Sequence, residues 1–364
     1  MLRTALIGFP SAGKTTLFQL MTSHREQPRA GHGKLEAVVG IARVPDPRVD
    51  RLAELYRPRK TTPATVEFAD VAGPGRTGAE ALLDVAPYRT ADALVHVIRA
   101  FRDPSVTHHG NLIAPATDAQ RMEDELLLAD LAVAERRLER IERDLKKGRT
   151  PELERERALI LRCRQALEEG LPLRGVPVSD EERKLLRGFQ FLSAKPLLLV
   201  INLDEADTPL LADTARAATA AGLGGFLSRA GTRAVPVCAK IELEIAQLDP
   251  ADAQGFLADL GLAEPGVSRV IRTTYDLLGY VSFLTAGEDE CRAWSIPRGT
   301  HAQVAAGEIH SDIARGFIRA EVVRFEHLVA RGSLAACRDH GEVRLEGKEY
   351  VVQDGDVINF RFAT

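Results

Sequence analysis

The chain has 364 residues, more than one ordinary globular core requires, so two or three domains are expected. Hydrophobic residues make up 45% of it and charged residues 27%, proportions that argue against a largely disordered chain. The formal net charge of -4 gives no overall support for binding nucleic acid, so any such contact needs a local basic patch.

The N-terminus and the cysteines indicate a cytoplasmic protein. Met1 leads directly into a strand pattern, so no signal peptide is expected, and no run of about 18 uncharged apolar residues predicts a membrane span. No CxxC pair suggests a zinc site or a disulfide framework. The four cysteines are therefore expected to be small, reduced core residues: Cys163, Cys238, Cys291 and Cys337.

The first predicted elements are a strand over residues 2–8 and a helix that begins at Lys14. Between them lies the sequence GFPSAGKT (8–15), which has the GxxxxGK[ST] spacing of a phosphate-binding loop. Its glycines let successive N–H groups point at a β-phosphate, and the helix adds the positive end of its dipole. We expect Lys14 to reach the β- and γ-phosphates and the Thr15 hydroxyl to bind Mg²⁺. The flanking strand and helix argue against a chance match.

Four more apolar runs predict buried strands with helical material between them. They are TVEFADV (65–71), ALVHVI (93–98), PLLLVIN (196–202) and AVPVCA (234–239). Strands and helices that alternate in this way predict an α/β fold, with a mostly parallel sheet and helices on both faces.

The strand over residues 65–71 carries Asp70, and Gly73 follows it in the pattern D-x-x-G. An aspartate in this place can hold Mg²⁺ through water, and the Gly73 N–H can sense a γ-phosphate. The alternative is an ordinary turn, because D-x-x-G is a common turn sequence. Its position on the next strand after the phosphate loop favours the functional interpretation.

Residues 117–189 predict an α-helical insertion with few glycines. Apolar residues recur at alternating spacings of four and three from Leu127 to Leu145, which is the signature of a coiled-coil seam. KKGRTP (146–151) interrupts the pattern, and residues 153–167 resume it, so an antiparallel hairpin is expected. Its basic tip, with Lys146, Lys147 and Arg149, could contact RNA phosphate, although such a cluster can also be simply solvated.

Asn202 ends the strand over residues 196–202 and begins Asn-Leu-Asp-Glu, where GTPases carry N-K-x-D to recognise guanine. Glu205 replaces the aspartate that accepts two hydrogen bonds from guanine, and Leu203 replaces the lysine that packs over the base. Selectivity for guanine is therefore not assured. A turn without base contact is the alternative.

The last eighty or so residues change to short strands separated by turns, as in EVRLEGKEYVVQDGDVINFRF, and predict a small separate mixed domain. Together with the motifs described above, this segment makes the chain resemble the YchF family of Obg-related P-loop NTPases over nearly its whole length. The motifs that carry the resemblance are GFPSAGKTTLF, VPDPR (44–48), DVAG, ELLLADL (125–131), NLDE, PVCAKIELEIAQL and the stretch from TAGEDECRAWSIPRGTH to the C-terminus.

The resemblance implies a Ras-like P-loop G domain in residues 1–116 and 190–277, a coiled-coil hairpin in residues 117–189, and a β-grasp (TGS) domain in residues 278–364. It also implies ribosome association and the use of ATP, or of both ATP and GTP. Carried over by position, the nucleotide-binding residues are Gly8, Ser11, Ala12, Gly13, Lys14, Thr15, Thr16, Asn202, Leu203, Glu205, Cys238, Ala239 and Lys240. Thr15 and Asp70 are the implied Mg²⁺ contacts, and Lys14, Asp70, Gly73 and His108 the implied catalytic residues.

The segments that should close over the phosphates differ from the family pattern. Pro74 stands where the family has a hydrophobic residue, PGRTGAEALL is shorter than the family's glycine-rich segment, and Lys34 replaces a threonine that binds Mg²⁺. His108 matches a family histidine associated with hydrolysis, although an exposed loop histidine is the alternative. The differences point equally to weak hydrolysis and to a rearranged site.

Two functions from different classes fit these observations. The first is a slow NTPase switch that favours ATP over GTP, uses Mg²⁺ and binds the large ribosomal subunit or translation factors, with rRNA as a candidate contact. The second is a nucleotide-binding scaffold with little hydrolysis. A metabolic kinase is disfavoured, since no acceptor site is apparent. The intact Lys14, Thr15 and Asp70 favour the switch, which is expected to be a monomer without membrane contact.

Overall fold

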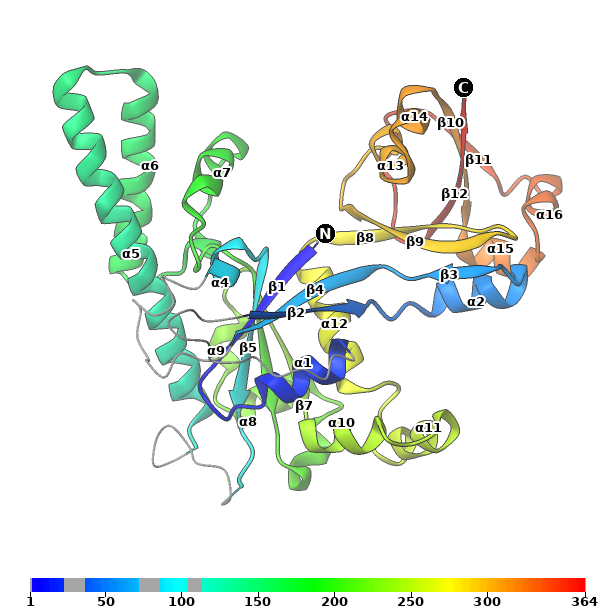
Figure 1. The fold of residues 1–364 in the computed structure, drawn as a ribbon, viewed down its shortest axis with the longest axis horizontal. Helices are drawn as coiled ribbons and strands as arrows, with labels where there is room; N and C mark the ends of the chain where they lie inside the picture. Colours follow the sequence, from blue (N-terminus) through cyan, green and yellow to red (C-terminus); the bar gives the residue numbers. More distant parts are fainter. Residues whose placement is uncertain (1, 23–36, 72–85, 104–112, 364) are drawn as a thin grey trace. The chain divides into compact units, whose positions relative to one another are not determined.

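The computed structural model describes residues 2–22, 37–71, 86–103 and 113–363, which form two compact units (Figure 1). The first unit comprises Met1–Ala42 and Glu67–Leu277, and the second comprises Arg43–Val66 and Leu278–Thr364. Four residues used in the sequence predictions lie outside the described residues: Lys34, Gly73, Pro74 and His108.

A six-stranded sheet forms the centre of the first unit, in the order β2-β4-β1-β5-β6-β7. The pairs β1-β5, β5-β6 and β6-β7 are parallel, which confirms the α/β prediction. The strands are β1 (Leu2–Ile7), β2 (Ala37–Arg43), β4 (Thr65–Val71), β5 (Ala93–Arg99), β6 (Leu197–Asn202) and β7 (Thr232–Val237).

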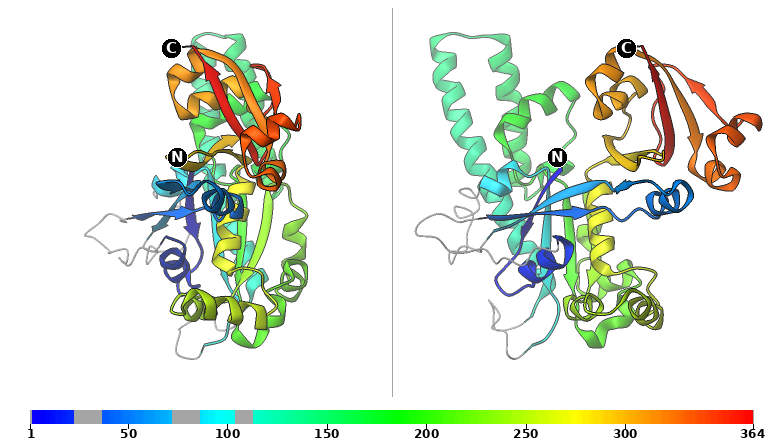
Figure 2. Two further views of the ribbon diagram at one scale, coloured as in Figure 1. Left: turned by 90° about the vertical axis from the view of Figure 1, so that its right-hand side faces the viewer. Right: turned by 45° about the vertical axis from the view of Figure 1, so that its right-hand side comes forward.

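Helices cover both faces of this sheet (Figures 1 and 2). Leu197, Leu199 and Ile201 of β6 share a core with apolar side chains of α5 and α8, whereas Leu198 and Val200 point to the opposite face and are equally buried. The helices of this unit include α1 (Lys14–Thr22), α4 (Ala86–Thr90), α5 (Pro115–Lys147), α8 (Thr214–Ala220), α9 (Gly224–Leu227), α10 (Ala239–Ile245), α11 (Pro250–Asp259) and α12 (Gly266–Leu277).

The predicted helical hairpin is formed by α5 and α6 (Pro151–Glu168), with α7 (Asp180–Leu186) following. Ala134 and Leu138 of α5 pack with Ile160 and Cys163 of α6, as the coiled-coil spacing predicts. Thr150 begins α6 by accepting a hydrogen bond from the Leu153 N–H at 3.2 Å, and Pro151 occupies the first turn, where its missing N–H is not needed. The residues that interrupt the heptads thus also start the second helix.

The second unit has a mixed six-stranded sheet in the order β11-β10-β12-β8-β9-β3. Pairs β8-β9, β10-β11 and β10-β12 are antiparallel, and β12-β8 is parallel. Ala302, Ala305 and Ala306 of one helix pack on this sheet. The elements are β3 (Lys60–Thr62), β8 (Tyr280–Thr285), β9 (Glu290–Pro297), α13 (Ala302–Ile309), α14 (Ser311–Arg315), β10 (Phe317–Arg324), α15 (Phe325–Arg331), α16 (Leu334–Asp339), β11 (Arg344–Glu346) and β12 (Asp356–Phe362).

Residues 43–66 belong to the same compact unit as the C-terminal residues, whereas the sequence placed them in the domain of residues 1–116. Within this unit β3 pairs in parallel with β9, and the Arg48 guanidinium of α2 (Pro47–Tyr56) donates to Asp354 at 2.8 Å. The three-residue strand KTT is polar and short, so no local pattern reveals that it joins a sheet built from residues more than 200 positions later.

All four cysteines are buried and free. Among the described residues, no helix has the length and apolar character needed to cross a membrane.

Candidate nucleotide-binding site

The loop between β1 and α1 has a backbone that only certain residues can adopt. Gly8 and Gly13 have φ angles of 141° and 98°, and Ser11 has a φ of 62°. A Cβ on Gly8 would lie 2.4 Å from the Val97 carbonyl oxygen, and one on Gly13 would lie 2.5 Å from Asn202 Nδ2. Both glycines are therefore required by close contacts as well as by their φ angles.

Lys14 lies inside this loop and is only 8% exposed. Its ammonium donates to the carbonyl oxygens of Gly8 at 2.8 Å and Phe9 at 2.9 Å. Burial lowers the pKa of Lys14, and the nearby charge of Asp70 opposes that shift. An ammonium held within a phosphate-binding loop can exchange these carbonyl oxygens for phosphate oxygens, which are stronger partners because they carry charge.

Thr15 and Asp70 are brought together as the sequence predicts. The Thr15 hydroxyl donates to Asp70 Oδ2 at 2.7 Å, and Asp70 is 1% exposed. Burial raises the pKa of Asp70, whereas the hydrogen bond from Thr15 and the charge of Lys14 lower it. Asp70 Oδ1 has no hydrogen-bond partner among the described residues. A hydroxyl beside a carboxylate with an unused oxygen is a donor set that fits Mg²⁺, which prefers oxygen ligands.

Asn202 connects two loops of the site through its buried amide. Its Nδ2 donates to the Ala12 carbonyl at 3.0 Å, and its Oδ1 accepts from the Ala239 N–H at 3.0 Å. The phosphate loop and the loop after β7 are thus held by one side chain at the end of β6. The predicted residues from the two distant segments lie in one site.

A pocket of about 480 Å³ opens beside Asn202. It is lined by eight residues expected from the sequence: Gly13, Thr16, Asn202, Leu203, Glu205, Cys238, Ala239 and Lys240. Phe101, Arg102, Asp103, Asp204 and Leu243 also line it and were missed by the sequence predictions.

Three of the missed residues, Phe101 to Asp103, come shortly after β5, whose last residue, Arg99, pairs with Asn202 of β6. Ligands bind beyond the carboxyl ends of parallel strands. Once β5 and β6 are known to be neighbours, the position of these residues after the end of β5 is therefore the signal that could have identified them. The Arg102 N–H donates to Asp204 Oδ2 at 2.9 Å and, with the Ala206 N–H, lowers the pKa of Asp204. That bond connects the missed segment to the Asn-Leu-Asp-Glu segment.

Glu205 and Lys240 form an ion pair in the same pocket. The hydrogen bond to the Glu205 carboxylate and the charge of Glu205 raise the pKa of Lys240. Gly73 and His108 lie outside the described residues, so their predicted roles remain predictions.

Comparison of the whole chain with known proteins shows which family it belongs to. The family model YchF-GTPase_C, described as a protein of unknown function (DUF933), matches residues 280–363. The ribosome-binding ATPase YchF of Bacillus subtilis (strain 168) is 40% identical over 366 residues, which cover 99% of each chain. The protein of that name from Escherichia coli O157:H7 is 37% identical over 368 residues, again 99% of each.

The solved structure of the Schizosaccharomyces pombe YchF GTPase has the same fold, with a TM-score of 0.80 and 26% sequence identity. The alignment covers 99% of this chain and 97% of that one. Full-length similarity to these relatives, together with the phosphate loop and the C-terminal match, shows that the chain belongs to the YchF family.

Proposed function

We propose that this protein is a ribosome-associated nucleoside triphosphatase that binds ATP in preference to GTP and hydrolyses it slowly. One observation carries the proposal: Lys14, Thr15 and Asp70 lie together at the end of a GxxxxGKT loop. The relatives, a ribosome-binding ATPase in two bacteria and a GTPase in a yeast, support it. A cytoplasmic location and a monomeric state accompany the proposal.

Each residue has a proposed task in this reaction. Thr15 and Asp70 would hold Mg²⁺, which when bound neutralises charge on the β- and γ-phosphate oxygens. Lys14 binds the same phosphates, and the loop N–H groups orient them. Gly73 is proposed to sense the γ-phosphate and His108 to orient water. Both assignments rest on their positions in the sequence.

Binding and turnover can be measured together. ATP is expected to bind more tightly than GTP, because Glu205 and Leu203 replace the residues that recognise guanine. Affinities of both nucleotides with Mg²⁺ would be measured by calorimetry, and phosphate release with and without purified ribosomes. GTP binding as tightly as ATP would contradict the proposed preference. Turnover with ribosomes that equals a Lys14→Ala background would favour the nucleotide-binding scaffold.

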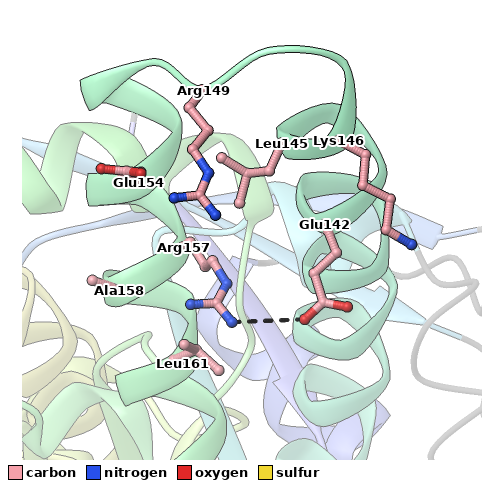
Figure 3. A pocket seen from close by; sticks show the side chains of 8 residues that line it. All are labelled: Glu142, Leu145, Lys146, Arg149, Glu154, Arg157, Ala158 and Leu161. Atoms are coloured by element: carbon pink, nitrogen blue, oxygen red, sulfur yellow. Dashed lines mark ion pairs between the residues drawn. The ribbon is translucent and has the colours of Figure 1, made fainter.

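The tip of the helical hairpin is the proposed contact with the large ribosomal subunit. Lys146, Lys147 and Arg149 are exposed there. Figure 3 shows Arg149 and Arg157 extending into the space between α5 and α6, in a pocket of about 590 Å³. The Arg157 guanidinium lies 3.8 Å from Glu142, whereas the exposed Arg149 belongs to the turn between the two helices. Basic side chains at the end of a rigid hairpin can reach rRNA backbone phosphates.

Replacing Lys146, Lys147 and Arg149 together by alanine is expected to weaken ribosome binding in a salt-dependent way. Each lost phosphate contact lowers the slope of log affinity against log salt by about 1, so a decrease of about 2 to 3 is expected. Cosedimentation with ribosomes over a range of KCl concentrations measures this. The control replaces the exposed Arg183, Lys184 and Arg187 by alanine, and equal slopes for the two triple variants would exclude the tip as a contact.

A further inference from the structure

The Glu205–Lys240 ion pair lies where the loops after β6 and β7 meet in the pocket. Glu205 begins a 3-10 helix (Glu205–Leu210), and Lys240 is the second residue of α10. The side chains are 44% and 66% exposed, respectively, so both can contact a ligand in the pocket. Their neighbours Leu203 and Cys238 are buried, with exposures of 4% and 2%, and fix the backbone on each side.

Guanine and adenine differ in how they meet a carboxylate. Guanine presents two adjacent donors, N1–H and N2–H₂, which a free carboxylate can accept with its two oxygens. Adenine presents the N6–H₂ donor beside the N1 lone pair, which a free carboxylate repels. An uncompensated Glu205 would therefore still favour guanine over adenine, although its extra methylene makes this preference weaker than that of an aspartate.

Lys240 changes this balance, because its ammonium occupies one oxygen of Glu205 and neutralises the carboxylate. The raised pKa of Lys240 keeps the ammonium charged at neutral pH. We propose that Lys240 is a residue that determines the specificity for the base. This inference rests on the function proposed above, in which nucleoside triphosphates are the ligands. The ion pair of Lys240 with Glu205 removes the advantage of guanine and allows adenine to bind.

Lys240→Met keeps the length of the side chain and removes its charge. The ratio of GTP affinity to ATP affinity is expected to rise about five- to tenfold, less than a fully buried charged hydrogen bond would give, because the pair is partly exposed. Calorimetry with non-hydrolysable ATP and GTP analogues and Mg²⁺ measures the ratio. Lys60→Met is a matched control: Lys60 is 67% exposed and lies 3.1 Å from Glu290 in the other unit. That variant should keep the wild-type ratio.

Two further variants separate the role of charge from the role of shape. Lys240→Arg keeps the ion pair and should keep the ratio. In a Glu205→Gln background, Lys240→Met should produce no shift, because no carboxylate remains to be neutralised.

An unchanged ratio in Lys240→Met would overturn the inference. An equal loss of both affinities would overturn it too, since Lys240 would then contact a part that both nucleotides share. Failure of the wild-type protein to bind either nucleotide would instead refute the proposed function.

Discussion

Lys14→Ala is expected to lower the affinity for ATP by at least about 100-fold, because hydrogen bonds from a charged donor contribute about 1.5 to 3 kcal/mol each and at least two are lost. The buried ammonium lies inside the phosphate loop and already donates to two carbonyl oxygens. Its replacement removes the positive charge closest to the expected β- and γ-phosphates. Phosphate release should fall to background, and calorimetry with Mg²⁺-ATP measures the affinity.

Lys195 provides a matched control for this change. Its ammonium also donates to backbone carbonyls, at 2.8 Å to Arg89 and also to Ala91, and burial likewise lowers its pKa. Lys195→Ala should reduce stability while leaving the affinity for ATP unchanged, since Lys195 lies outside the pocket-lining residues. If Lys14→Ala bound ATP within about threefold of the wild type, the charge-assisted contact assigned to Lys14 would be wrong.

Asp130→Ala is expected to have the largest effect on stability. Asp130 of α5 is completely buried and accepts hydrogen bonds from Leu192 N at 2.8 Å, Ser193 N at 2.7 Å and Ser193 Oγ at 2.6 Å. The variant leaves these donors buried without an acceptor, so the free energy of unfolding should fall by about 3 to 5 kcal/mol. Urea unfolding followed by circular dichroism measures it.

The contribution of Asp130 to the free energy of unfolding should also depend on pH. Burial raises the pKa of Asp130 to about 6, although the hydrogen bonds from Ser193 and Leu192 oppose the shift. The folded protein thus binds the proton more tightly than the unfolded chain. The part of the contribution of Asp130 that comes from binding this proton is complete below the unfolded pKa of 3.8 and is lost as the pH rises through about 6.

The stability difference between the wild type and Asp130→Ala should therefore be smaller at pH 7.5 than at pH 4.5, by about 2 kcal/mol. Asp213→Ala is a control for the size of the effect, because Asp213 caps the exposed start of α8 and its loss should lower stability by only about 1 kcal/mol. A difference that stays constant between the two pH values would show that Asp130 titrates alike in the folded and unfolded chains.

Local sequence determined several parts of this protein. The phosphate loop follows from glycines at fixed spacing and a lysine at the start of a helix, because these requirements are met within eight residues. Strands β5 and β6 are buried at every position and mostly apolar because both faces of a parallel sheet are covered. The hairpin followed from its heptad spacing and from the break at residues 146–151.

Only the tertiary structure decided which distant segments meet. The pairing of β3 with β9 assigned residues 43–66 to the C-terminal unit, and the order of β5 and β6 brought Phe101 and Arg102 to the pocket. The ion pair between Glu205 and Lys240 likewise joins the ends of two strands. Strand order and register depend on how whole elements pack and on the loops that connect them. A local pattern records which face of an element is buried, but not which element covers it.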